Sequence, residues 1–343
     1  MSTVLNSTCT PPDIVEVFIS QLMIANHSFI LTVILISFYS TYFATLKLIR
    51  QNVFPACTRI LLFSSIINGI IHQGTTAFIR VRALLHAIWY RQNPCHLQFQ
   101  ASDCCVEGIV YYYTNLFSSI VCVSLFLDRL FSFWKTYDSH QKKAAIIYIL
   151  LQFLIPPPIL YWVFYDANYS GYVPMCNYPP PGSSGKFYFV TTYRLNCFYA
   201  LAIASVALFL VNWRREKKIF HKDYGVDVRY NSYERYLGTK AVCYVLIVQV
   251  ICLAGTSYIP TSFNQNRDAI GYYWFHIAAA FATGLTYANF FVPIIVYYQT
   301  IKIVRSRRVK IQKLKVQPKQ DDYFNGLQNV WEVQFEKHNE RNN

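Results

Sequence analysis

The chain has 343 residues, of which 54% are hydrophobic, 17% aromatic and only 14% charged. Soluble domains average about 25% charged residues, so this composition argues against a soluble protein. The net charge of +14 would suggest a nucleic-acid-binding protein, but the Lys and Arg residues lie between apolar runs and after the last run, a distribution that indicates membrane orientation and no nucleic-acid partner.

Seven apolar runs follow one another along the chain, none with the two-residue alternation of a barrel strand. Runs of about 20 residues are long enough to cross a membrane core of about 30 Å as helices, and lipid offers backbone groups no water partner. The runs cover Phe29–Ile49, Ile60–Ile79, Cys105–Phe126, Ala144–Tyr165, Phe187–Leu210, Ala241–Phe263 and Tyr272–Tyr298. The sequence therefore predicts an all-α membrane protein built as a seven-transmembrane helix bundle.

The segments outside these runs define the expected organisation. We expect an extracellular N-terminus at 1–28, the seven-transmembrane domain at 29–298, a basic juxtamembrane segment at 299–316 and a disordered cytoplasmic tail at 317–343. No basic stretch precedes an apolar core near the N-terminus, so the first helix, and not a cleaved signal peptide, is expected to direct insertion. The basic segment fits either a helix along the inner leaflet or a solvated tail.

Positive charges between the runs set the expected orientation. Four basic segments fall on one side of the membrane, at 47–50, 135–143, 214–222 and 302–319. Because cytoplasmic loops are enriched in Lys and Arg, we predict a multi-pass protein of the cell membrane with its N-terminus outside. The arginines that oppose this rule, at the outer end of the second run, are Arg80, Arg82 and Arg91.

Glycosylation sequons support the same orientation. They lie on the predicted outer side at Asn6, Asn26 and Asn168, and we expect Asn6 and Asn168 to carry sugar.

A charged pair marks the inner end of the third run. Asp128 and Arg129 are adjacent there, and an acid beside an arginine can form a local ion pair that breaks when a helix bundle opens. This pair resembles the acid-Arg-aromatic switch of rhodopsin-like G-protein-coupled receptors, although Leu130 stands where that family has Tyr. The alternative is plain interfacial anchoring, because charges are frequent at helix ends.

The same resemblance implies a disulfide. At the start of the third run, Cys104 stands where rhodopsin-like receptors keep the cysteine that bonds to the second outer loop, and Cys176 lies in that loop. Closing a long loop stabilises by a few kcal/mol in an oxidising compartment, although Cys105 is a rival partner. Cys9 and Cys95 form a second bridge or remain free thiols, because spacing does not determine connectivity.

Two prolines predict helix hinges. Tyr258 and Pro260 in the sixth run resemble the aromatic-x-Pro hinge of rhodopsin-like receptors, because proline frees a carbonyl and bends a helix. In the seventh run, Asn289 and the Pro293–Tyr297 string resemble Asn-Pro-x-x-Tyr, with the Asn displaced and the Tyr one residue late. Ordinary prolines of membrane helices are the alternative.

Polar side chains in the outer half of the bundle are candidate ligand contacts. A small-molecule site combines apolar walls with a few polar anchors, whereas many tyrosines belong to interfacial belts. The candidates are Glu107, Tyr111, Tyr112, Asn115, Tyr193, Arg194, Tyr258 and Tyr273. Arg194 fits a pocket or the membrane interface equally, and His72 is either a titrating group or a hydrogen-bonded structural histidine.

No enzyme is expected. The chain has no His-Glu-x-x-His, Gly-x-Ser-x-Gly or phosphate-loop motif, so we assign no catalytic residue, metal site or cofactor. The seventh run contains no lysine that would hold retinal, which argues against a visual pigment.

Several strings, taken in order, resemble the nematode serpentine chemoreceptors of class alpha, with classes alpha-beta and beta as close alternatives. They are Cys9, Cys57-Thr58-Arg59-Ile60-Leu61-Leu62, Ile71-His72-Gln73, Asn93-Pro94-Cys95, Cys104-Cys105, Asp128-Arg129 and Tyr233-Glu234-Arg235. The resemblance implies a rhodopsin-like architecture, a location in the cilium of a sensory neuron, and partners that are a small-molecule ligand, a heterotrimeric G protein and the lipid bilayer.

The predicted function is therefore that of a chemosensory G-protein-coupled receptor for a small environmental chemical. The ligand would favour one arrangement of the third, sixth and seventh helices, after which Arg129 and the 214–240 loop meet the G protein. One alternative is a seven-helix ligand-gated channel, which requires an inside N-terminus. The other is a small transporter, which would show matching repeats and broken helices.

Overall fold

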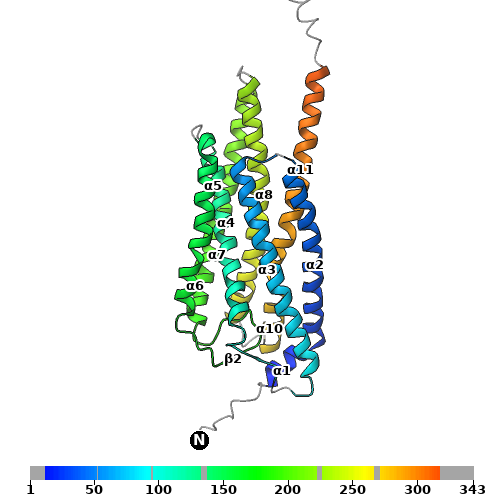
Figure 1. Cartoon of the computed structure of the whole chain (residues 1–343), viewed down its shortest axis with the longest axis vertical. Coiled ribbons are helices and arrows are strands. Elements are labelled where there is room, and N and C mark those ends of the chain that lie inside the picture. Colours follow the sequence, from blue (N-terminus) through cyan, green and yellow to red (C-terminus); the bar gives the residue numbers. More distant parts are fainter. Residues whose placement is uncertain are drawn as a thin grey trace, which may run out of the picture. The chain divides into compact units, whose positions relative to one another are not determined.

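The computed structural model describes residues 12–51, 53–93, 96–132, 137–221, 226–265 and 271–316. The chain divides into two units, Met1–Tyr297 and Tyr298–Asn343. Within the first unit, long helices run side by side as a bundle (Figure 1). The all-α class is therefore confirmed.

The helices follow the predicted runs. Their bounds are α1 Pro12–Ile19, α2 Gln21–Arg50, α3 Ala56–Trp89, α4 Cys105–Phe131, α5 Tyr137–Leu154, α6 Pro156–Phe164, α7 Ser184–His221, α8 Val226–Gln265, α10 Tyr272–Phe281 and α11 Gly284–Val316. Two short strands, β1 Phe99–Gln100 and β2 Tyr172–Val173, pair antiparallel with Phe99 opposite Val173. The predicted spans correspond in order to α2, α3, α4, α5 with α6, α7, α8, and α10 with α11.

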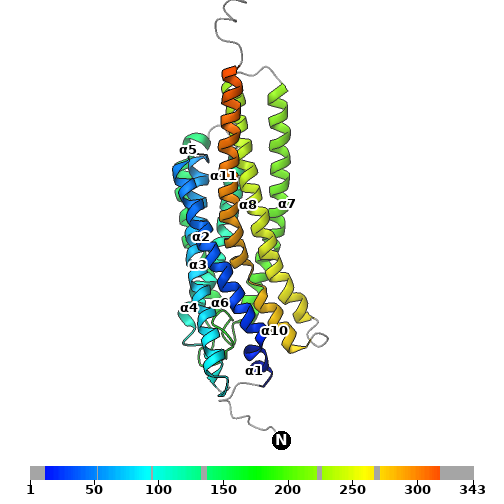
Figure 2. The same cartoon turned by 90° about the vertical axis from the view of Figure 1, so that its right-hand side faces the viewer.

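The two ends of the first unit differ. Figures 1 and 2 show α1, α10 and the strand pair at one end and the tips of α7 and α8 at the other. The first end holds a disulfide between Cys104 and Cys176 and is called the disulfide end below. The opposite end, called the Arg129 end, contains the last turn of α4 with Arg129.

Two of the predicted spans consist of two helices each. In the fourth span, α5 ends at Leu154 and α6 begins at Pro156, because proline is tolerated in the first turn of a helix and disrupts an interior. In the seventh span, Ala282 and Thr283 separate α10 from α11. Pro293, predicted as the hinge of that span, instead lies inside the continuous α11.

Helical structure also extends beyond the predicted spans. Residues 12–28, expected as part of an extracellular tail, form α1 and the start of α2, and Ser20 caps α2 by accepting a hydrogen bond from the Met23 amide. Val17 and Phe18 of α1 are buried in an apolar cluster at the disulfide end. The expected 214–240 loop is mostly helix, because α7 continues to His221 and α8 begins at Val226.

Among the residues that the structure describes, six helical stretches are long and apolar enough to cross a membrane, and α3 is not among them. Its buried face carries many polar side chains, including Asn68, His72, Gln73 and Arg80. These groups face protein and not lipid, so the low apolar content of α3 reflects its interior position. In the second unit, residues 298–316 are the C-terminal part of α11, which makes the predicted basic segment helical.

Candidate functional site

A cavity of about 510 Å³ lies at the disulfide end among α4, α6, α7 and the 166–183 segment. This volume is within the range of about 300–1,000 Å³ that is common for small-molecule sites. Apolar wall residues include Leu116, Leu160, Val163, Phe164, Phe187 and Phe275. The polar lining includes Tyr111, Tyr112, Asn115, Asn177, Tyr178 and Arg194. Apolar walls with few polar groups are the arrangement expected of a ligand pocket.

The 166–183 segment forms one wall of this cavity and is held in place at several points. Cys176 bonds to Cys104 across a sequence separation of 72, which is the pairing that the resemblance implied, and Cys105 is free. The Tyr112 hydroxyl donates to the Asn177 carbonyl at 2.7 Å, and the Tyr178 hydroxyl lies 3.3 Å from His276 Nδ1. A wall fixed in this way loses little conformational freedom when a ligand binds.

A glycine lets α4 approach the same segment. A Cβ placed on Gly108 would lie 3.1 Å from the Cys176 carbonyl oxygen, which is a tight contact. A residue without a side chain therefore suits this turn of α4, one turn after the disulfide.

The structure brings some of the predicted pocket residues together and separates others. Tyr111, Tyr112, Asn115 and Arg194 all line the cavity. Tyr258, by contrast, is 63% exposed on the surface of α8, as is Tyr193 at 65% on α7. Tyr273 packs against the apolar cluster that includes Val17 and Phe18 and is absent from the cavity lining. The structure therefore places these three tyrosines outside this cavity, because a run of sequence does not show which face of a helix points inward.

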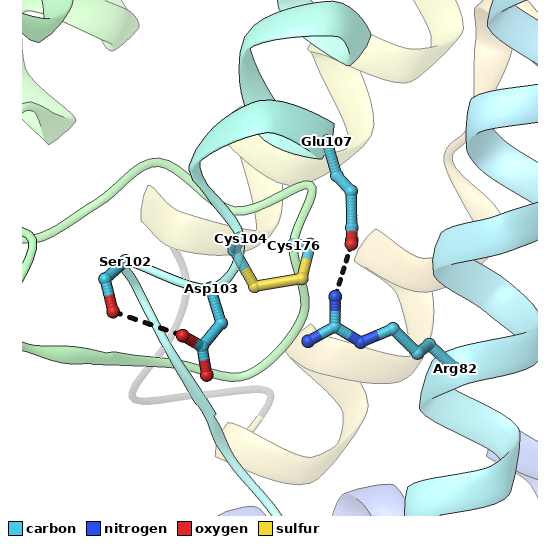
Figure 3. The surroundings of a disulfide bond; sticks show 6 residues. All are labelled: Arg82, Ser102, Asp103, Cys104, Glu107 and Cys176. Atoms are coloured by element: carbon cyan, nitrogen blue, oxygen red, sulfur yellow. Dashed lines mark hydrogen bonds and ion pairs between the residues drawn. A yellow bond between two sulfur atoms is a disulfide. The ribbon is translucent and has the colours of Figure 1, made fainter.

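Glu107 is also outside the cavity lining and forms an ion pair with Arg82 (Figure 3). The Arg82 guanidinium carbon lies 4.9 Å from the centre of the Phe99 ring. The pair joins α3 to α4 beside the Cys104–Cys176 bond, so Glu107 has a structural contact at this end.

Arg80 is buried inside the bundle, with an exposed fraction of 1%. Its Nη1 donates to Asn26 Oδ1 at 2.9 Å and lies 3.2 Å from His27 Nδ1, while Nη2 donates to the Ala280 carbonyl at 2.9 Å. Ala280 is in the last turn of α10, where carbonyls lack helical partners and the helix dipole favours a cation. Arg80, which counted against the predicted orientation, is thus a buried side chain that joins α2, α3 and α10.

Further polar contacts connect α3 to its neighbours. Asn68 Nδ2 donates to Ser118 Oγ at 2.8 Å, and His72 Nδ1 lies 2.9 Å from Thr114 Oγ1, both on α4. His72 is fully buried and absent from the cavity lining, so its contacts are those of a structural histidine.

The predicted charged pair is buried at the Arg129 end. Arg129 donates to Asp128 Oδ2 from Nε at 3.0 Å and from Nη2 at 2.6 Å. Thr58 of α3 donates to the same carboxylate oxygen at 2.6 Å and accepts a hydrogen bond from Arg129 Nη2. Asp128 and Arg129 are 0% and 1% exposed, so both charges are shielded in this arrangement.

A glycine of α8 covers the arginine. A Cβ placed on Gly238 would lie 3.1 Å from Arg129 Nη1, and Gly238 itself is buried. Helix α8 therefore packs closely against Arg129 of α4, and a side chain at position 238 would require one of them to shift by a few tenths of an ångström. Sequence reasoning did not identify Gly238, since a lone glycine in a helix gives no signal of its contact.

The predicted modification sites differ in accessibility. Asn168 is exposed, and its Oδ1 accepts hydrogen bonds from the amide and hydroxyl of Ser170, the third residue of its sequon. Asn26 is fully buried against Arg80, so this sequon is inaccessible in the folded protein. Asn6, Cys9, Cys95 and the 317–343 tail lie outside the described residues.

The 166–183 segment begins with Asp166, which lies outside the membrane spans. Lys186 Nζ donates to Asp166 Oδ1 at 2.7 Å, and this hydrogen bond holds the pKa of the carboxyl below its usual value.

Comparison with known proteins matches almost the whole chain. Residues 4–331 match the profile of the serpentine type 7TM GPCR chemoreceptor Sra family. The chain is 47% identical over 330 residues to serpentine receptor class alpha-28 of Caenorhabditis elegans, which covers 95% of this chain and 97% of that protein. Serpentine receptor class alpha-29 of the same organism is 45% identical over 338 residues, or 97% of each chain. Serpentine receptor class alpha-31 is 42% identical over 323 residues, covering 94% and 96%.

Proposed function

The chain belongs to the Sra family of serpentine 7TM GPCR chemoreceptors, and from this premise we propose that its cavity at the disulfide end binds the chemical it detects and that its Arg129 end activates a heterotrimeric G protein. The family is a multi-pass membrane receptor family with a chemosensory function. The channel and transporter alternatives have no support in these relationships.

The proposed mechanism is a shift between two arrangements of the bundle. In the closed arrangement, Asp128 and Thr58 hold Arg129 in contact with Gly238 of α8. In the open arrangement, α8 moves away and Arg129 becomes accessible to the G protein. A ligand drives this change only through its difference in affinity for the two arrangements, and a difference of about 1.4 kcal/mol changes the population ratio tenfold.

The observation that carries the proposal is the burial of Arg129. A charged side chain with an exposed fraction of 1% is costly to leave without its partner, so the Asp128 carboxylate stabilises the closed arrangement. Removing that carboxylate raises the free energy of the closed arrangement, in which Arg129 is buried, more than that of the open arrangement, in which it is solvated.

The test is nucleotide exchange on a panel of G proteins by the purified receptor in lipid nanodiscs. We expect Asp128→Asn to raise basal exchange by about tenfold or more, because breaking a buried ion pair costs about 3–5 kcal/mol. Arg129→Gln should abolish exchange, and Lys186→Gln, at the other end of the bundle, is the control. Basal exchange that is the same in wild type and Asp128→Asn would contradict the proposal.

We also propose that the N-terminus faces outside, that Asn6 and Asn168 carry sugar, and that the receptor lies in the cilium of a sensory neuron, as the family resemblance implies. The orientation test is glycosidase-sensitive mobility of the expressed chain. Because Asn26 is buried, the Asn6→Gln/Asn168→Gln double variant should show no remaining shift. A wild-type chain without sugar, combined with a C-terminal tag exposed on intact cells, would reverse the orientation. The receptor family and the absence of catalytic motifs support a function without enzymatic activity.

A further inference from the structure

The cavity contains one arginine for which the described residues provide no partner. Arg194 of α7 is half-buried and lines the cavity. None of the described residues accepts a hydrogen bond from its guanidinium or forms an ion pair with it, and the lining includes no Asp or Glu. As far as the described residues show, the site has one positive charge without a counter-charge.

The other arginines within the bundle show that this is unusual for the molecule. Arg129 pairs with Asp128, and Arg82 pairs with Glu107. Arg80 donates hydrogen bonds to the oxygens of Asn26 and Ala280. Ionised groups inside a membrane protein are expensive and generally pair with an opposite charge or an acceptor, so an arginine without either indicates that the acceptor comes from outside the chain.

The rest of the cavity lining is mostly apolar, which indicates a ligand with an apolar part. Aromatic and aliphatic side chains from α4, α6, α7 and α10 form most of the wall, among them Phe164, Phe187 and Phe275. Asn115 uses its Nδ2 to donate to the Tyr111 carbonyl at 2.8 Å, and Tyr112 uses its hydroxyl on Asn177. These two groups donate within the protein, and Arg194 is the charged donor among the described residues of the lining.

From this contrast we infer that the ligand is an organic acid: a carboxylate with an apolar body, whose carboxylate is bound by Arg194 and whose body lies against the aromatic wall. A guanidinium binds a carboxylate through two parallel N–H···O hydrogen bonds, which gives both affinity and orientation. The inference rests on the proposed function, because it names the class of chemical that the same cavity detects.

The test compares acids with their primary amides, which have nearly the same shape and no charge. Purified receptor in phosphatidylcholine nanodiscs, which contain no net-anionic lipid, is titrated at neutral pH with phenylacetate, phenylbutyrate and octanoate and with the three amides. The readout is the thermal unfolding temperature. We expect the best acid to stabilise the wild type at a concentration about tenfold to a hundredfold below that of its amide, as hydrogen bonds between ionised groups predict.

Variants test whether the preference for acid over amide depends on Arg194. Arg194→Gln should bring the acid and the amide to within about twofold of each other, and Arg194→Lys should keep part of the preference because it keeps the charge. Arg214→Gln makes the same substitution at an exposed position of the same helix, outside the cavity lining, and should leave the preference unchanged. Amides that stabilise the wild type as well as the acids, acids that give no stabilisation, or an acid preference that survives in Arg194→Gln would each overturn the inference.

The wild-type comparison of acid with amide requires no variant, so a poorly folding Arg194→Gln protein does not prevent a decision. Failure of the proposed function has a different signature, since basal exchange in Asp128→Asn is measured without ligand. Raised basal exchange in Asp128→Asn together with equal stabilisation by acids and amides would leave a receptor whose ligands are neutral, whereas exchange equal to that of the wild type would overturn the proposed function itself.

Discussion

Enlarging Gly238 should open the receptor without any ligand. In Gly238→Ala, the added Cβ would lie 3.1 Å from Arg129 Nη1, a few tenths of an ångström closer than an ordinary contact. Arg129 cannot move aside freely, because its Nε and Nη2 are bound to Asp128. The strain therefore acts between α4 and α8 and is relieved when the two helices separate.

The magnitude follows from the cost of overpacking. One extra methyl in a tight contact costs about 1 kcal/mol at the low end of measured values, which corresponds to about a fivefold rise in the open population and in basal nucleotide exchange. Alanine also favours helix over glycine by about 0.5–1 kcal/mol, but α8 is helical in both arrangements, so this gain does not alter their ratio. Gly238→Val, with a larger side chain, should give a larger rise.

The matched control is on the same helix. A Cβ on Gly255 of α8 would meet nothing within 4 Å, so Gly255→Ala has the same helix gain without the contact. The assay is basal exchange on a fixed amount of folded receptor in nanodiscs. If Gly238→Ala and Gly255→Ala gave equal basal exchange, the idea that α8 holds Arg129 closed through this contact would be refuted.

Two other predictions concern stability. Arg80→Met leaves the Asn26 Oδ1 and the Ala280 carbonyl without their donor, which costs about 1–3 kcal/mol for each buried group. The unfolding temperature of this variant in nanodiscs should therefore fall well below that of Arg91→Met, the control at an exposed arginine. Equal unfolding temperatures of the two variants would contradict a bridging role for Arg80. The Asp166–Lys186 contact should weaken in acid. Because the pKa of the Asp166 carboxyl is lowered in the folded protein, the contact contributes fully above the unfolded value of about 4 and is lost as pH falls through the folded value. Hydrogen exchange of the 166–183 segment should accelerate in that acid range in wild type but show no such step in Asp166→Asn, and a step that persists in the variant would assign the effect to another group.

The positions of the helices in the chain could be predicted from the sequence because membrane spanning depends on one-dimensional properties. Length and the lack of charge identify a run that crosses lipid, and each predicted run overlaps the observed helices, with the fourth and seventh runs each extending over two of them. The end of each span could also be predicted, so Asp128 and Arg129 were expected together at one end of α4 and Tyr111 and Asn115 in its other half.

The faces of the helices could not be predicted in the same way. Tyr258 and Tyr111 are both tyrosines in apolar runs, yet one is exposed on α8 and the other lines the cavity. Cavity residues that come from loops or distant spans, such as Asn177 and Phe275, carry no signal in a single sequence. The interruption at Ala282 and Thr283 could not be predicted, because no proline or glycine-rich turn marks it in the sequence.

Arg80 has a consequence for biosynthesis. Its hydrogen-bond partner Ala280 is 200 residues later in the chain, and α3 is not among the stretches that are apolar enough to span a membrane unaided. Until the last span is inserted during synthesis, Arg80 of α3 therefore has only its contacts with Asn26 and His27 of α2. A chain truncated before Ala280 would leave the Arg80 guanidinium without one of its acceptors. The last span to be made thus completes the hydrogen bonds of the second.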